Sequence, residues 1–305
     1  MHAVFVDASE TLADLFETVS TPLDLPIIVN RDPDVAPRQL PGVMFGNAAI
    51  AIIDHTALPT EIARQCLGLR HVVFLGTGAR SYMNPEELAE LGITVHLIRG
   101  YGDTAVAECA IALMWAGARG LAHMDREMRA GNWLREDGVQ LTGKTLGLIG
   151  FGGIAAEVAR IARGSGMKVI AWNRTPKSHD GVEFVELNAL LAQSDVVSLH
   201  LLLTDETRGF LSRDRIAAIK PGAILVNTAR GALVDEAAMI EALRAGQLRH
   251  AGLDVFDTEP LPVGHPLTRL SNVTLSAHSA FRTPEASVNL VEAALVHCRR
   301  IVAAG

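Results

Sequence analysis

Cysteine is scarce in this sequence of 305 residues, and the few that occur form no metal or disulfide pattern. They are Cys66, Cys109 and Cys298, with no CxxC pair among them. An odd number without paired spacing argues against a disulfide framework and against a zinc site, so we expect no metal. It favours reduced thiols in a cytoplasmic protein.

The chain also lacks an excess of positive charge and a long apolar run. Its net charge of -7 gives little electrostatic reason to bind nucleic acid or an anionic membrane. The N-terminal MHAVFVDASE has no basic segment, and Asp7 and Glu10 interrupt its apolar run too early for a signal peptide. The longest apolar stretch, Thr104 to Ala118, contains Glu108 and is too short to span a bilayer. We therefore expect a soluble, cytoplasmic protein.

What is present is a rhythm of short apolar runs alternating with helical patterns. Such alternation predicts an α/β fold with parallel sheets, and the length predicts two domains. The helical spacing predicts one long helix over Thr104 to Arg129 and a last helix over Glu285 to Ala303. The expected strands are VFVDA (4–8), AIAIID (49–54), HVVFLG (71–76), ITVHLI (93–98), TLGLIG (145–150), KVIAWN (168–173), VEFVE (182–186), VVSLHL (196–201), AILVNTA (223–229), AGLDVF (251–256) and NVTLSAH (272–278).

A glycine motif follows one of these strands and opens a helical pattern. The segment TLGLIGFGGIAAEVAR places Gly150, Gly152 and Ala155 in G-x-G-x-x-A register. The first glycine allows a tight turn, the second lets the backbone approach a pyrophosphate, and the small third residue lets the helix pack on the strand. An ordinary strand-to-helix turn is the alternative, but the intact βαβ order favours a dinucleotide site.

The next strand ends without the acidic residue that normally binds a ribose hydroxyl. Asn173, Arg174 and Thr175 stand there instead. An acid would repel a 2'-phosphate by about 4 kcal/mol per charge pair at ~4 Å with an effective dielectric constant near ~20. Because Arg174 and Thr175 both suit phosphate, the sequence predicts a preference for NADP over NAD. The alternative is that Arg174 is a solvated loop residue and Asn173 bonds the ribose hydroxyls.

Four polar residues follow later strands, at the edge where open α/β sheets bind ligands. They are Arg230 in VNTARGALVDE, Asp254 and Glu259 in AGLDVFDTEPLP, and His278 in TLSAHSA. Singly, each is as well explained as a cap or a structural residue. Together they indicate a catalytic site.

Several segments, taken in order, resemble the D-isomer-specific 2-hydroxyacid dehydrogenases, and in character the glyoxylate and hydroxypyruvate reductases. The resemblance covers nearly the whole chain and implies two doubly wound parallel-sheet domains. A Rossmann NAD(P)-binding domain, residues 101–281, would be inserted into a smaller flavodoxin-like substrate-binding domain, residues 1–100 and 282–305. The segments are LGTGARSYMN, RGYGDTAVAECAIAL, GKTLGLIGFGGIA, HLLLTDET, LVNTARGALVDEAAMIEAL, AGLDVFDTEPLP and HPLTRLSNVTLSAHSA.

The resemblance implies a role for each polar residue. His278 would be the acid/base, Glu259 its partner, and Arg230 the anchor for the substrate's carboxylate and carbonyl. This set fits reduction of a 2-oxo acid, which needs a hydride at C2, a proton for the developing alkoxide and a cation for the carboxylate. Asp254 would lie near the nicotinamide, orienting its carboxamide and coupling to the histidine.

The resemblance also assigns substrate contacts in the first domain and a set of cofactor contacts. In GTGARSY the backbone N–H groups of Gly78 and Ala79 would hold the substrate carboxylate, although an ordinary strand-end turn explains them equally well. Arg80 and Arg99 can add positive charge to the cleft or be merely solvated. The residues expected to bind the cofactor are Val106, Gly150, Gly152, Gly153, Ile154, Asn173, Arg174, Thr175, His200, Thr207, Thr228, Ala229, Arg230, Asp254 and His278.

The sequence departs from the family pattern at three positions. Leu202 and Ala277 stand where proline is usual, and Cys109 stands where histidine is common. None of these changes removes a reacting group. They bear on loop geometry and on substrate identity, since the lost prolines would have rigidified two loops.

The leading hypothesis is therefore an NADP(H)-preferring reductase of small 2-oxo acids. An alternative within the same class is an NAD-dependent dehydrogenase of a larger or phosphorylated hydroxyacid. A second class is a non-catalytic, nucleotide-sensing scaffold that resembles transcriptional corepressors of this fold. A formate dehydrogenase fits less well, because formate oxidation needs no base. Family resemblance further suggests a homodimer formed through the helix over 104–129 and the segment around Trp133.

Overall fold

The described chain divides into two compact units. The computed structural model describes residues 2–21, 24–44 and 47–304. Unit 1 contains 1–102 and 282–305, and unit 2 contains 103–281. Both are α/β units with parallel sheets, so the predicted fold class is confirmed.

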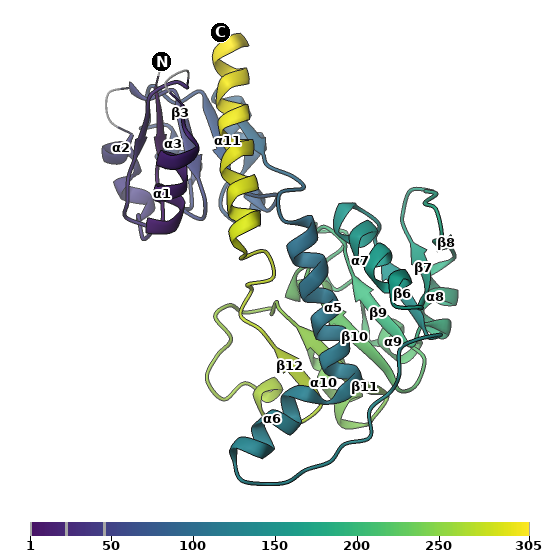
Figure 1. Cartoon of the computed structure of the whole chain (residues 1–305). Helices are drawn as coiled ribbons and strands as arrows, with labels where there is room; N and C mark the ends of the chain where they lie inside the picture. Colours follow the sequence, from purple (N-terminus) through teal and green to yellow (C-terminus); the bar gives the residue numbers. More distant parts are fainter. Residues whose placement is uncertain (1, 22–23, 45–46, 305) are drawn as a thin grey trace. The chain divides into compact units, whose positions relative to one another are not determined.

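Unit 1 is built on a five-stranded parallel sheet with the order β2-β1-β3-β4-β5. Helices cover both faces. One face packs against α1 and α11 through residues such as Phe5, Phe16 and Leu295, and the other packs against the short α2, α3 and α4. The elements are β1 (Ala3–Phe5), α1 (Glu10–Val19), β2 (Ile27–Val29), α2 (Leu40–Val43), β3 (Ile50–Ile53), α3 (Thr60–Ala63), β4 (His71–Phe74), α4 (Pro85–Glu90), β5 (Thr94–Leu97) and α11 (Pro284–Ala304) (Figure 1).

Unit 2 is built on a seven-stranded parallel sheet with the order β12-β11-β10-β9-β6-β7-β8. The order reverses between β6 and β9, which is where a doubly wound sheet opens a ligand crevice at its carboxyl edge. The elements are α5 (Asp103–Arg119), α6 (Leu121–Arg129), β6 (Thr145–Ile149), α7 (Gly153–Gly164), β7 (Lys168–Trp172), β8 (Glu183–Phe184), α8 (Leu187–Gln193), β9 (Val196–Leu199), α9 (Arg213–Ala217), β10 (Ala223–Asn227), α10 (Glu236–Arg244), β11 (Leu248–Leu253) and β12 (Val273–Leu275).

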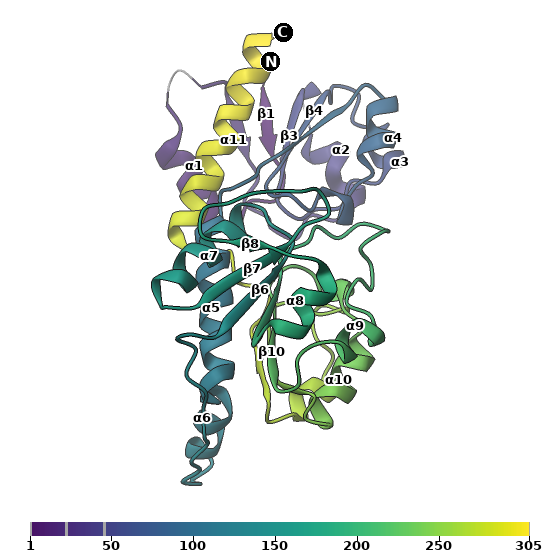
Figure 2. The ribbon, with the colours of Figure 1, turned by 90° about the vertical axis from the view of Figure 1, so that its right-hand side faces the viewer.

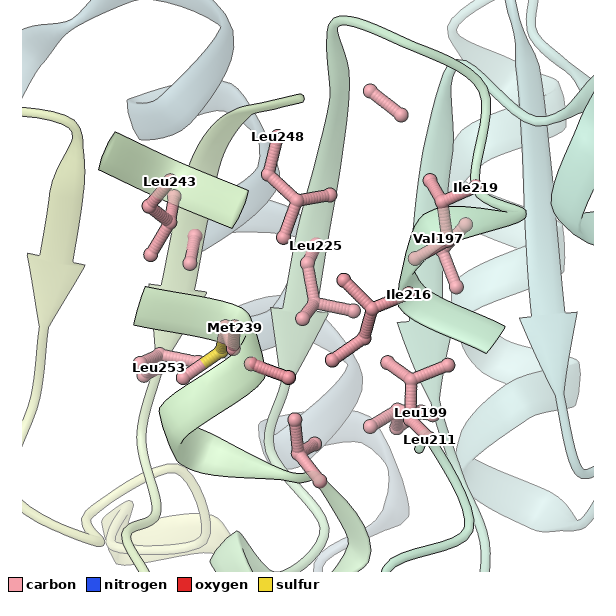
Figure 3. Close-up of a cluster of buried hydrophobic side chains, with 14 of the residues drawn as sticks. Val197, Leu199, Leu211, Ile216, Ile219, Leu225, Met239, Leu243, Leu248 and Leu253 are labelled. Carbon is pink, nitrogen blue, oxygen red and sulfur yellow. The ribbon is translucent and has the colours of Figure 1, made fainter. Parts of the chain in front are cut away.

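Two hydrophobic layers hold the sheet of unit 2. On one face, α5 and α7 pack through small residues such as Ala107 and Ala155. On the other, α8, α9 and α10 pack through larger ones, including Ile216 and Met239 against Leu225 (Figures 2 and 3). Because the central strands are covered on both faces, they read as continuous apolar runs in the sequence.

The expectation of one long helix over 104–129 is wrong. The chain forms α5, then breaks at Gly120 and continues as α6 at an angle of 66° (Figure 1). Gly120 takes a left-handed conformation with φ of 63°, which a glycine adopts at little cost and which ends a right-handed helix. Of the described helices, none has alone the length and hydropathy of a membrane span, although α5 and α6 pass that test as a bent pair.

A buried histidine makes the stability of unit 2 depend on pH. His250, on β11, is only 3% exposed, and its Nε2 lies 2.9 Å from Thr274 Oγ1. Burial lowers the pKa of His250 to about 4 from an ordinary value near 6.5. Between these values the unfolded chain binds a proton that the folded chain does not. The free energy of unfolding therefore decreases as the pH falls through this window, and the stabilisation is fully present above it.

We expect the substitution His250→Gln to remove this contribution. Wild type should lose roughly 3 kcal/mol more stability than the variant on going from neutral pH to about pH 4. Urea unfolding of both proteins at a series of pH values measures the difference. Two parallel pH profiles would show that His250 titrates normally in the folded chain.

Candidate active site

A glycine turn connects β6 to α7. Gly150 has φ of 87°, and a Cβ there would lie 2.7 Å from the backbone oxygen of His200. Around Gly152, by contrast, no atom lies within 4 Å of where a Cβ would be. No side chain caps α7, its first turn carries no acid, and Ala155 is fully buried against the sheet. The N–H groups and positive dipole end of α7 are thus free to bind an anion.

The beginning of α5 packs against the same turn. A Cβ on Gly153 would meet the carboxylate of Asp103, which would have to move aside to make room for it. Burial raises the pKa of Asp103, and the nearby charge of Glu157 adds to the effect. Val106 and Ile154, both expected at the cofactor, are half-buried on α5 and α7.

Asn173, at the end of β7, is tied to the glycine turn. Its Oδ1 accepts a hydrogen bond from Phe151 N at 3.1 Å, and its Nδ2 donates to Thr175 O at 2.7 Å. Lys177 Nζ donates to Phe151 O at 2.6 Å. The side-chain amide of Asn173 therefore joins two loops of the crevice, and its polar atoms already have partners within the protein.

Arg174 and Thr175, which follow Asn173 in the sequence, are both exposed. Arg174 Nη1 forms a salt bridge of 2.7 Å with Glu206 Oε2, which comes from the loop after β9. Sequence reasoning did not foresee this partner, because 32 residues separate the two positions.

The loop after β9 carries two further expected contacts. Burial lowers the pKa of His200 to about 4, so its imidazole is neutral at ordinary pH, and its Nε2 lies 2.9 Å from Ser198 Oγ. Thr207 Oγ1 donates to Leu202 O at 2.7 Å and accepts from Thr204 N at 2.7 Å. Thr207 thus closes the loop in which Leu202 replaces the usual proline.

Arg230 is positioned by a buried asparagine at the end of β10. Asn227 Nδ2 donates to Arg230 O at 2.9 Å, and Asn227 Oδ1 accepts from Ala229 N at 3.0 Å. The guanidinium of Arg230 donates to Ala229 O at 2.7 Å. Asn227 was not singled out from the sequence, because an asparagine within an apolar strand gives no local functional signal.

A close backbone approach brings the Arg230 turn to the segment that carries Glu259. A Cβ on Gly231 would overlap the backbone of Phe256 and Asp257, so the turn rests directly on this segment. Phe256 N donates in turn to Glu259 Oε1 at 2.9 Å. Because β10, β11 and β12 pair in parallel register, the residues after them meet at one edge of the sheet.

His278 and Glu259 form a hydrogen-bonded pair at this edge. His278 Nδ1 lies 2.6 Å from Glu259 Oε2, and the imidazole is partly exposed. The carboxylate is held in orientation by its second oxygen through the bond from Phe256 N. Since Nδ1 is engaged, Nε2 of His278 is left to exchange a proton with a ligand.

Asp254 holds the loop that carries His278. Its carboxylate is fully buried and accepts from Ser276 Oγ at 2.6 Å, Ser279 N at 3.0 Å and Ala280 N at 2.9 Å. Its backbone oxygen accepts from His278 N at 2.7 Å. Asp254 therefore fixes the backbone of the loop, whereas its coupling to the imidazole and its contact with a nicotinamide stay predictions.

The residues present suit a bound dinucleotide. The open backbone at Gly152 and the uncapped start of α7 match the requirements of a pyrophosphate. Thr228 Oγ1, after β10, is buried and has no hydrogen-bond partner among the described residues. A buried hydroxyl without a partner is costly, so a ligand at this edge would relieve it.

In unit 1, Gly78 and Ala79 form the start of a short 3-10 turn, Ala79–Ser81, after β4. Their carbonyl oxygens accept backbone hydrogen bonds from Ser81, Tyr82 and Met83. Arg80 is paired with Glu86, and Arg99 is exposed. The expected contacts of these residues with a substrate stay predictions.

Cys109 is a packing residue in the structure. Burial raises the pKa of its thiol to about 11, and the charge of Asp254 adds to the effect. A thiol that keeps its proton at neutral pH is a poor nucleophile. The cysteine therefore does not replace a histidine as an acid or base.

Comparison with known proteins identifies the family. Residues 111–280 match the family model of the D-isomer specific 2-hydroxyacid dehydrogenase, NAD binding domain. The glyoxylate reductase of Aeropyrum pernix is 39% identical over 243 residues, which cover 75% of this chain and 72% of that protein. The hydroxypyruvate reductase of Thermotoga maritima is 39% identical over 246 residues, covering 78% and 80%.

A third relative is longer than this chain. The D-3-phosphoglycerate dehydrogenase of Archaeoglobus fulgidus is 36% identical over 248 residues, which are 79% of this chain but 47% of that protein. The chain thus spans about half the length of this relative.

Solved structures agree over the full length. The TT0316 protein of Thermus thermophilus is 35% identical, covers 100% of this chain and 97% of its own, and superposes with a TM-score of 0.87. An acyclic imino acid reductase in complex with NADPH and D-Arg is 26% identical, covers 99% and 97%, and has a TM-score of 0.87. The chain belongs to the D-isomer specific 2-hydroxyacid dehydrogenase family, and unit 2 contains its NAD binding domain.

Proposed function

We propose that this protein is an NADP(H)-preferring oxidoreductase that reduces small 2-oxo acids, of the glyoxylate and hydroxypyruvate type, to D-2-hydroxy acids. The observation that carries the proposal is the 2.6 Å hydrogen bond between His278 Nδ1 and Glu259 Oε2. It orients one imidazole nitrogen and leaves the other for a substrate oxygen. A hydroxyl-forming reaction needs such a proton donor, whereas formate oxidation does not.

The proton follows a short path. Glu259 holds the imidazole through Nδ1, and protonated His278 donates its Nε2 proton to the carbonyl oxygen as that oxygen becomes an alkoxide. When bound, reduced nicotinamide supplies the hydride to C2. The 2-oxo acid, NADPH and one proton thereby become the 2-hydroxy acid and NADP+.

Arg230 binds the substrate. Its planar guanidinium can hold a carboxylate through two parallel charge-assisted bonds and stabilise the developing charge on the carbonyl oxygen. The hydrogen bonds of Asn227 to the Arg230 turn fix the backbone from which the guanidinium extends. The Arg230 turn thus contacts, through Gly231, the segment that carries Glu259, the hydrogen-bond partner of His278.

The NADP preference rests on the end of β7, where Asn173, Arg174 and Thr175 present no acid to a 2'-phosphate. NADPH in the related acyclic imino acid reductase is consistent with this choice. Small substrates are favoured by the glyoxylate and hydroxypyruvate reductases among the relatives. The phosphoglycerate dehydrogenase relative favours the second candidate, an NAD-dependent dehydrogenase of a phosphorylated hydroxyacid.

A matrix of NADH and NADPH against glyoxylate, hydroxypyruvate, 3-phosphohydroxypyruvate and phenylpyruvate, compared by kcat/KM, separates these functions. We expect the highest value with NADPH and one of the two small acids. A maximum with NADH and the phosphorylated acid would establish the second candidate. Cofactor binding without turnover of any acid would favour a nucleotide-sensing scaffold.

We also propose a homodimer formed through α6 and the segment after it. Among the described residues of this region, Leu121 is 52%, Met128 49% and Trp133 75% exposed, so these large apolar side chains are accessible to a second copy of the chain. Sedimentation of only monomer at micromolar concentration would contradict the dimer.

The three cysteines are free, and we propose a cytoplasmic location for the protein.

A further inference from the structure

The salt bridge between Arg174 and Glu206 spans the glycine turn. Arg174 follows β7 and Glu206 follows β9, and these two strands flank β6 on either side in the sheet. The bridge of 2.7 Å therefore crosses over the carboxyl end of the strand that leads into Gly150. It lies where the sequence predicts the adenosine ribose of the cofactor.

The pair changes the charge balance expected from the sequence. The strand end has no acid of its own, but Glu206 brings one to it from a different loop. The arginine expected to bind a 2'-phosphate is already paired with that acid. The side-chain amide of Asn173 is held in place by its bonds to Phe151 and Thr175, and it carries no charge to offer a 2'-phosphate.

The bridge is weak enough to be exchanged. The side chains of Arg174 and Glu206 are 78% and 76% exposed, and ion pairs this accessible contribute little to stability. Arg174 can thus leave the carboxylate for a phosphate without a large cost. Glu206 would then remain close to a doubly charged phosphate, which it repels.

We propose that Glu206 is a specificity-determining residue that restrains the preference of this protein for NADP(H) and retains binding of NAD(H). With NAD(H), the bridge stays intact and the free carboxylate oxygen of Glu206 accepts a ribose hydroxyl. With NADP(H), Arg174 exchanges Glu206 for the 2'-phosphate. The inference rests on the proposed function, since it assumes that Arg174 meets the ribose end of the cofactor.

The test compares Glu206→Gln with Asp205→Asn. Asp205 is exposed on the same loop, and Arg174 is paired with Glu206 and not with it. Both substitutions remove one negative charge from the same loop. A difference between the two variants in cofactor affinity would therefore come from the position of Glu206 and not from the change in net charge. Isothermal titration calorimetry of each protein with NADP+, NAD+, adenosine 2',5'-bisphosphate and AMP gives the dissociation constants without any turnover.

For Glu206→Gln, we expect the ratio of the NAD+ to the NADP+ dissociation constant to rise at least tenfold, or about 1.4 kcal/mol. The ratio for AMP and the bisphosphate should rise in parallel, and Asp205→Asn should change neither by more than about twofold. Arg174→Ala should weaken NADP+ much more than NAD+. In the double variant the effect of Glu206→Gln on the ratio should shrink, because the two residues are coupled.

An unchanged ratio in Glu206→Gln, or an equal change in Asp205→Asn, overturns the inference. Neither result depends on the substrate. If wild type turns over no 2-oxo acid, or prefers NADH, the proposed function fails while the binding ratios still decide the role of Glu206. Thermal unfolding of both variants controls for folding, which an exposed loop position should not disturb.

Discussion

Replacing His278 with glutamine is expected to lower kcat for 2-oxo acid reduction about a thousandfold, within the range that positioned proton donors contribute. Glutamine can still hydrogen-bond to a carbonyl oxygen, but it has no acidic proton to give to the alkoxide. The glycine turn and the residues at the end of β7 are unchanged in this variant, so NADPH should still bind, and its dissociation constant should change far less than kcat. Steady-state kinetics and calorimetry measure the two quantities.

The variant Glu259→Gln separates the charge of the pair from its hydrogen bond. Glutamine can accept the bond from His278 Nδ1 but does not stabilise the imidazolium. We expect a smaller loss of kcat than in His278→Gln, because the imidazole keeps its hydrogen-bonded orientation and its own proton. If both variants retain wild-type turnover, the pair does not transfer the proton.

Replacing Arg230 with lysine is expected to lower kcat/KM for hydroxypyruvate about a hundredfold. Lysine keeps the charge but loses the planar fork, and with it one of two parallel bonds to the carboxylate. Hydrogen bonds to charged groups contribute roughly 1.5–3 kcal/mol each, which corresponds to this loss. The measurement is kcat/KM for the acid at saturating NADPH, with KM for NADPH as a second readout.

The variant Arg249→Lys is the matched control. Arg249 is exposed on β11, at the opposite end of the sheet from the turn that carries Arg230. It should leave kcat/KM unchanged within about twofold. A loss in Arg230→Lys confined to the KM of NADPH would contradict the role of Arg230 as a substrate anchor.

Motifs that act through the backbone could be read from the sequence. The spacing of Gly150, Gly152 and Ala155 after an apolar run specifies both a turn and a helix start, because Gly150 has a positive φ and Ala155 is fully buried. The parallel sheets followed from continuous apolar runs. The strands of the unit 1 sheet could not all be predicted in this way. Its edge strand β2 contains only Ile27–Val29, which is too short to give a strand pattern in the sequence.

Three features of the structure could not be predicted from the sequence. Gly120 ends α5 in a region whose apolar spacing runs on through α6, and periodicity alone does not register a left-handed residue. The sequence around Glu206 did not indicate its salt bridge with Arg174. Nor did the sequence around Asn227 indicate its hydrogen bond to the backbone of Arg230. The pair of Arg174 and Glu206 depends on which strand ends are neighbours, which only the sheet order reveals, whereas Asn227 bonds a residue only three positions away.

The central claim is that the protein transfers a hydride to a small 2-oxo acid with a proton from His278. Stopped-flow absorbance of NADPH, on mixing the protein and NADPH with hydroxypyruvate, tests it most directly. We predict rapid loss of NADPH with formation of an equal amount of D-glycerate, and a rate reduced about a thousandfold in His278→Gln. Bound NADPH that persists in the presence of both hydroxypyruvate and glyoxylate would contradict the account.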